Sequence, residues 1–182
     1  MIRKLLTIVV AAATLSGAGD ATMAGAASPT LSVAGNGLSI ARLGTGESAA
    51  MATITRAIGR PTIHLSADPG LENCGVSATA TWHSMIVFFN RNRLVGLSFG
   101  PGHIPKVTTP AGLRLGDSLS QARAIYPKKL TTSGSQAGTW FAATPSGRID
   151  GFLNPSTARA PQPNARIETI EVGVVGCPAM SP

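Results

Sequence analysis

The sequence is poor in cysteine, in histidine and in acidic residues, and each shortage excludes a class of site. The two cysteines among its 182 residues cannot build a cysteine-rich zinc site or a dense disulfide scaffold. The three histidines show neither a His-Glu-x-x-His nor a His-x-His spacing, so we expect no metal site and no cofactor. Eight acidic residues leave few carboxylate pairs for glycoside hydrolysis.

Glycine, proline and positive charge are what the sequence has in excess. Its 21 glycines and 13 prolines are too many for a helical bundle, and they show no period of the collagen type. The length predicts one domain, or two small repeats that form one. The net charge of +7 favours anionic partners, such as wall polymers, acidic lipid headgroups or an acidic protein. Simple solubility explains the charge equally well.

The N-terminus has the pattern of a secretory signal peptide. Arg3 and Lys4 form a basic start, residues 5–15 are apolar, and Ala24-Gly25-Ala26 fits a small-residue cleavage site. As a helix, residues 5–15 would rise about 16 Å, which is too short to span about 30 Å of hydrocarbon. We therefore predict a signal peptide at 1–26, a flexible mature N-terminus at 27–36, and a secreted or envelope-associated protein without a transmembrane anchor. Because of the export, nucleic acid is not an expected partner.

An exported chain with two cysteines favours a disulfide bond. Outside the cytoplasm, Cys74 and Cys177 would close a long loop and contribute at most about 4–5 kcal/mol. Two free thiols are the alternative. A catalytic thiol is disfavoured, because no histidine stands at a suggestive spacing and Gly176-Cys177-Pro178 has the character of a strand end.

A short motif occurs twice in the chain. Leu43-Gly44-Thr45-Gly46-Glu47-Ser48 is followed by Leu113-Arg114-Leu115-Gly116-Asp117-Ser118, and a tryptophan and then a glycine come after each copy. The same order in both halves predicts a duplication. We place the first repeat at 37–107 and the second at 108–182, both within one domain.

The motif also predicts two helix starts. Ser118 and Gln121 have the spacing of a capping box, and Ser48 has the matching position in the first half. Asp117, which we count with the caps, supplies negative charge where the helix dipole favours it. Prolines at 61 and 127 limit each helix to about ten residues, so the helices must pack on something to be stable.

Sheet is predicted for most of the remaining chain. Residues 78–89 alternate and are rich in Thr, Val and Phe; a turn at 90–92 then leads into 93–99. In the second half we expect strands at 138–144, 148–153 and 166–175. The prediction is an α+β fold of two tandem helix-plus-antiparallel-strand repeats, with the helices packed on one face of an antiparallel sheet.

The helix starts Gly46-Glu47-Ser48 and Gly116-Asp117-Ser118 resemble those of the β-lactamase-inhibitor-protein and BamE-type modules. The resemblance covers residues 37–182 and implies tandem modules with an inhibitor-like or binding role. BamE proteins are lipoproteins with one module, and this chain lacks the lipid-bearing cysteine. The inhibitor proteins carry a disulfide in each repeat, whereas each half of this chain has one cysteine. Residues 112–118 and 176–179 are also similar to small secreted proteins of high-GC Gram-positive bacteria.

A hydrolase is the alternative that requires an assembled catalytic group. Ser118, His83 and Asp117 contain the right chemical groups, but Gly-Asp-Ser is not a nucleophile elbow, and capping explains both Asp117 and Ser118. We therefore do not expect an enzyme. A small extracellular hydrolase with unidentified catalytic residues stays as an alternative.

One sheet face should be left free by the helices. Counting alternately along 78–89 places Trp82, Ile86 and Phe88 on one face. The candidate binding surface therefore consists of Trp82, Phe88 and Trp140, with Arg91 and Arg93 at the neighbouring turn; the alternative is that both tryptophans belong to the core. The predicted function is an exported non-enzymatic binding or inhibitor-like module whose partner is a protein or an anionic envelope component. A basic structural component of the envelope is a further alternative.

Overall fold

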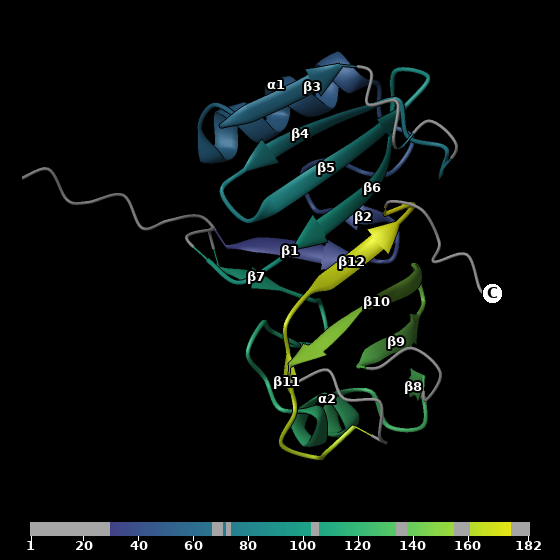
Figure 1. The fold of residues 1–182 in the computed structure, drawn as a ribbon. Helices are drawn as coiled ribbons and strands as arrows, with labels where there is room; N and C mark the ends of the chain where they lie inside the picture. Colours follow the sequence, from purple (N-terminus) through teal and green to yellow (C-terminus); the bar gives the residue numbers. More distant parts are fainter. Residues whose placement is uncertain are drawn as a thin grey trace, which may run out of the picture.

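A large antiparallel sheet dominates the molecule. The computed structural model describes residues 30–66, 71, 74–102, 106–133, 138–154 and 161–175. Within these ranges the chain forms a nine-stranded sheet, a three-stranded sheet and two helices (Figure 1). The helices are α1 (Glu47–Ile58) and α2 (Leu119–Ile125).

The strands of the large sheet come from both halves of the chain. In spatial order they are β3 (Ile63–Ser66), β4 (Ala78–Trp82), β5 (Met85–Asn90), β6 (Arg93–Phe99), β12 (Ile170–Gly173), β10 (Gly147–Asn154), β9 (Thr139–Thr144) and β8 (Leu130–Ser133), and β11 (Arg166–Ile167) pairs with the end of β10. The small sheet has the order β2 (Gly37–Leu38), β1 (Leu31–Ala34), β7 (Val107–Thr108). The last strand of the chain, β12, thus lies in the middle of the large sheet.

The prediction of an α+β fold made of two tandem helix-plus-strand repeats is wrong. One continuous antiparallel sheet makes up most of the described structure, and only two helices, neither longer than 12 residues, accompany it there. The sheet is continuous because β12 pairs with β6 over the register from Ile170↔Phe99 to Gly173↔Gly96, and with β10 at Asp150↔Glu171. This pairing satisfies backbone groups that would otherwise form an exposed strand edge.

The segment 78–89 is two strands, where the sequence predicts one. Trp82 pairs with Met85 across a two-residue turn at His83 and Ser84, and His83 has a positive φ of 53°. Histidine tolerates this left-handed conformation better than most residues. The turn shifts the alternation of side chains along the chain. Trp82 and Met85 therefore point to one face of the sheet, and Ile86 points to the other. The predicted turn at 90–92 is confirmed, with positive φ at Arg91 and Asn92, as in a type I′ hairpin.

The predicted flexible segment 27–36 contains a strand. Leu31–Ala34 forms β1, which pairs with β2 in antiparallel and with β7 in parallel orientation. Leu31 and Val33 of this strand are buried in the core. Residues 1–29, including the predicted signal peptide, lie outside the described residues. So does Cys177, and the Cys74–Cys177 disulfide therefore stays a prediction.

The core lies on one face of the large sheet. Side chains of this face, such as Met85, Leu97 and Val172, are fully buried and pack in one cluster with Ile54 of α1 and Leu119 of α2. Neither helix within the described ranges is long and apolar enough to cross a membrane.

The two helices begin differently. Ser118 caps α2 as predicted: its Oγ accepts from Gln121 N at 3.2 Å, and Gln121 Oε1 accepts from Ser118 N at 2.8 Å. The prediction for Ser48 is wrong, because α1 already starts at Glu47 after Gly46 and has no side-chain cap. Asp117 is not a cap either; its Oδ2 accepts from Arg114 N at 2.8 Å and closes the turn before α2.

The loops that lead into the helices are held by equivalent contacts. Arg93 Nη1 donates to Gly44 O at 2.8 Å, and Arg166 Nη1 donates to Gly116 O at 2.8 Å. Each of these glycines also donates its own N–H to a strand carbonyl, at Leu94 and Ile167 respectively. The equivalent residues in the structure are Gly44 and Gly116, so the two loops match with Gly46 opposite Ser118, two residues away from the sequence alignment that pairs Gly46 with Gly116.

Candidate functional site

The surface predicted around the tryptophans does not form. Trp82, Trp140 and Phe88 are 1%, 0% and 6% exposed. The alternative that both tryptophans belong to the core is the one that the structure supports. For Trp82 the reason is the turn at His83 and Ser84, which directs its side chain to the same face as the buried Met85. Its Nε1 donates to Gly59 O at 2.8 Å, at the end of α1.

The two arginines of the predicted surface are exposed, but they lie at a hairpin turn. Arg91 occupies the turn itself with a φ of 47°, and Arg93 holds the loop at Gly44. Arg93 therefore has a structural contact that explains its presence, and the structure does not bring the five predicted residues together into one binding surface.

The face of the large sheet that points away from the core carries a continuous line of side chains. The strand registers place eight residues side by side across the whole sheet, one from each of β3, β4, β5, β6, β12, β10, β9 and β8. They are Ile63, Thr81, Ile86, Ser98, Glu171, Asp150, Phe141 and Thr131. Because side chains alternate along a strand, this line belongs to the face opposite the buried one. We call it the open face.

Apolar side chains on the open face remain in contact with solvent. Ile63 and Leu65 on β3 are 53% and 49% exposed, Ile86 on β5 is 37% exposed, and Phe152 on β10 is 44% exposed. Single exposed apolar residues are ordinary on a protein surface. A set of them that shares one face of one sheet has the character of an interaction surface.

Two carboxyl groups lie side by side at the centre of the open face. Asp150 on β10 and Glu171 on β12 are directly opposite one another, and Glu171 Oε1 accepts a hydrogen bond from Ser98 Oγ at 3.0 Å. Arg148 Nη2 lies 3.3 Å from Asp150 Oδ2. The Arg148 guanidinium also lies over the Phe141 ring, 4.3 Å from its centroid. The acidic pair is thus flanked by a hydroxyl on one side and by an arginine on the other.

Both carboxyl groups are harder to ionise than free side chains. Burial raises the pKa of Asp150, and the charge and hydrogen bond of Arg148 oppose that rise. Burial also raises the pKa of Glu171, and the neighbouring charge of Asp150 raises it further, while the hydrogen bonds of Ser98 and Thr169 oppose the rise. Like charges directly opposite in a sheet are destabilising. An added cation between them would relieve this repulsion.

The residues of the hypothetical catalytic group are occupied elsewhere. Ser118 and Asp117 form the helix cap and the turn described above, and His83 lies in the turn between β4 and β5. Among the described residues, no hydrogen bond joins either of the first two to His83. The part of the chain that the structure describes contains no group of three or more His, Cys, Asp or Glu side chains that could hold a metal ion.

The sequence analysis missed the acidic pair as a unit. Asp150 follows Arg148 at a spacing of two, and Glu171 stands between the buried Ile170 and Val172. Alternation alone therefore places each carboxyl group on the solvent side of its strand. That the two strands are neighbours does not follow from the local sequence.

Comparison with known proteins gives no match: no family model, no curated protein and no solved structure is similar to this chain. The resemblance to the β-lactamase-inhibitor-protein and BamE-type modules therefore stays a prediction.

Proposed function

We propose that the protein is an exported, non-enzymatic binding module that holds a partner protein on the open face of its large sheet. The observation that carries this proposal is the placement of exposed apolar side chains around the Asp150–Glu171 pair, on the one face of the sheet that the core does not use. Asp150 and Glu171 each have one stabilising partner, Arg148 and Ser98, but their placement directly opposite one another opposes folding. Two such carboxyl groups are expected where binding of a partner, and not stability of the fold, determines which residues occupy these positions.

The chemistry of the open face favours a partner that inserts a lysine or arginine between apolar contacts. A cationic side chain would lie between Asp150 and Glu171, where it would offset their mutual repulsion and their loss of hydration. The exposed Ile86 and Phe152 would pack against the apolar neighbours of that cation. Arginine flanked by apolar contacts is a frequent centre of protein interfaces. If the partner is an enzyme, occupation of its surface in this way would make the module an inhibitor.

The test is capture of a partner by the immobilised protein from the envelope fraction and culture fluid of the source cells. A double variant, Asp150→Asn with Glu171→Gln, removes the charges and keeps the side-chain sizes. Glu47→Gln is the matched control, because Glu47 is a carboxylate that contacts His64 near α1 and lies off the open face. Thermal unfolding of each variant verifies that it is folded.

We expect the same protein to be captured by the wild type and by Glu47→Gln, and captured at least about tenfold less by the double variant, as for a buried charge pair that loses its partner. Phe152→Ser should weaken capture as well, through the apolar part of the face. A partner that binds all variants equally would contradict the proposal. So would an absence of any protein captured above background.

A further inference from the structure

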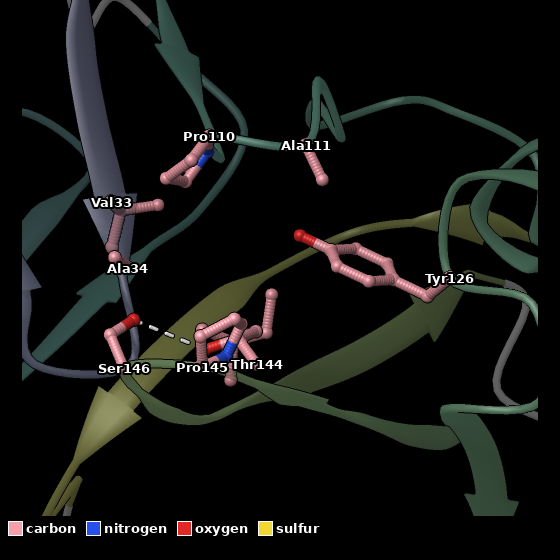
Figure 2. A pocket seen from close by; sticks show the side chains of 9 residues that line it. Val33, Ala34, Pro110, Ala111, Tyr126, Thr144, Pro145 and Ser146 are labelled. Atoms are coloured by element: carbon pink, nitrogen blue, oxygen red, sulfur yellow. Dashed lines mark hydrogen bonds between the residues drawn. The ribbon is translucent and has the colours of Figure 1, made fainter.

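A cavity lies where the small sheet meets the end of the large sheet (Figure 2). Its volume is about 210 Å³. Its walls come from β1, from the loop after β7, from Tyr126 directly after α2, from the turn between β9 and β10, and from β10 itself. The wall residues on which the argument depends are Val33, Pro110, Ala111, Tyr126, Thr144 and Ser146.

The walls are held apart by specific contacts. Gly35 N donates to Ser146 Oγ at 3.2 Å, which ties β1 to the turn between β9 and β10. Gly35 and Gly147 approach so closely that a Cβ atom on Gly35 would overlap the backbone of Gly147. On the opposite side, Tyr126 Oη donates to Thr109 Oγ1 at 2.7 Å and fixes the ring. The cavity is therefore a built feature of this junction.

The lining favours an apolar occupant. Protein interiors contain few voids larger than a water molecule, and this cavity has several times the volume of about 30 Å³ that one water takes in the liquid. Two of its polar groups are already satisfied: the hydroxyls of Thr144 and Ser146 lie 3.1 Å apart, and Thr144 Oγ1 also donates to Gly147 O. Water in the cavity would therefore find few partners.

The Tyr126 hydroxyl is the polar group that remains for a ligand. Figure 2 shows it pointing into the space between Pro110, Ala111 and Thr144. Its hydrogen is used by Thr109, so the oxygen is left with the capacity to accept one hydrogen bond. Burial raises the pKa of this hydroxyl and its hydrogen bond with Thr109 opposes the rise, so the hydroxyl is protonated at neutral pH, as an ordinary tyrosine is.

We propose that this cavity binds a small, mostly apolar molecule with a single hydrogen-bond donor, of the size of a substituted benzene ring, and that Tyr126 Oη accepts the donor. An engineered apolar cavity of about 150 Å³ holds benzene. The larger cavity here has room for a ring with a methyl and a hydroxyl group. The remaining walls of the cavity are apolar and therefore favour a ligand whose other surfaces are apolar.

The test compares two probe molecules, p-cresol and toluene, which differ by one hydroxyl group. Each is titrated into the purified protein and followed by amide chemical shifts in nuclear magnetic resonance. We expect saturable shifts at Val33 and Ala111 with both, and about two- to tenfold tighter binding of p-cresol, as one neutral hydrogen bond provides. Tyr126→Phe keeps the wall and removes the acceptor, so it should abolish this preference and leave toluene binding within about twofold.

A second pair of variants tests the location. Ala111 is an exposed residue on the rim, and Ala111→Phe should fill the entrance and weaken both probes by about tenfold or more. Ala52→Phe, at an exposed position on α1, is the matched control and should change neither. The inference is overturned by wild-type protein that shows no saturable shift, by equal affinity for the two probes, or by binding that survives Ala111→Phe.

Discussion

The acidic pair on the open face should lower the stability of the folded protein, and the size of this effect should depend on pH. Glu171→Gln removes one of two facing charges and keeps a side chain of the same size, whose amide oxygen can still accept from Ser98 Oγ. Because like charges directly opposite in a sheet destabilise it by about 0.2–1 kcal/mol, the variant should be more stable than the wild type at pH 7 by a gain in this range. For a chain of this length that gain corresponds to a rise in melting temperature of about 0.4–4 °C.

The sign of the pH dependence follows from the raised pKa of Glu171. In the unfolded chain the carboxyl group has a pKa of about 4.3, so as pH rises it loses its proton before the folded protein does. The unfavourable contribution of Glu171 is therefore absent below about pH 4, grows as pH rises through the folded pKa, and is complete above it. The gain from Glu171→Gln should be present at pH 7 and should vanish near pH 3.

Thermal unfolding followed by circular dichroism at both pH values measures this gain. Glu47→Gln is the control and should give no gain at pH 7, because a carboxylate in the first turn of α1 is favoured by the helix dipole. The reasoning is refuted if Glu171→Gln lowers the melting temperature at pH 7. It is also refuted if the gain is the same at pH 7 and pH 3.

Three further predictions test the fold. Trp82→Phe should destabilise more than Trp140→Phe in denaturant unfolding, by about 1–3 kcal/mol, because Trp82 Nε1 bonds the Gly59 carbonyl while Trp140 Nε1 has no hydrogen-bond partner in the part of the chain that the structure describes. Ser118→Ala should lower the unfolding free energy by about 1 kcal/mol and Ser48→Ala by less than about 0.5 kcal/mol, since only Ser118 caps a helix; a reversed order would contradict the assignment. Gly96→Ala should prevent accumulation of folded protein, because the added Cβ would overlap the Val174 carbonyl next to β12, and normal yield and melting would contradict this packing.

Features encoded over a few neighbouring residues were predictable from the sequence. The capping box of Ser118 and Gln121 needs four consecutive residues, and it is present as predicted. Ser48 also follows a Gly-acid pair, but it has Met51 where Ser118 has Gln121, and α1 already begins at Glu47, whose N–H donates to the distant Asn92 carbonyl. The difference between the two helix starts depends on a contact between α1 and a hairpin, which the local pattern does not contain.

The turn between β4 and β5 shows how one missed turn changes the prediction of a surface. His83 and Ser84 lack the usual Asn-Gly signature, and apolar residues alternate on both sides of them. Counting faces straight through the turn therefore places Trp82 with Ile86, although Trp82 is buried and Ile86 is 37% exposed. The placement of Trp82 on the predicted aromatic surface was wrong for this reason.

The acidic pair could not be predicted because it depends on strand order. Asp150 and Glu171 come together only because the last strand lies between β6 and β10. No turn or short connection in the sequence specifies that neighbour, and the order of strands in a sheet is set by the packing of the whole core. The individual strands follow from alternation, whereas their arrangement does not.

Carboxyl labelling of the captured complex tests the role of the open face most directly. The free protein and the complex with its partner are treated with a carbodiimide and an amine, and the modification of each carboxyl group is measured by mass spectrometry. Labelling of Asp150 and Glu171 should fall at least about fivefold in the complex, while that of Glu47, which lies off the open face, should stay the same. Unchanged labelling of the pair, or protection confined to Glu47, would contradict binding through the open face.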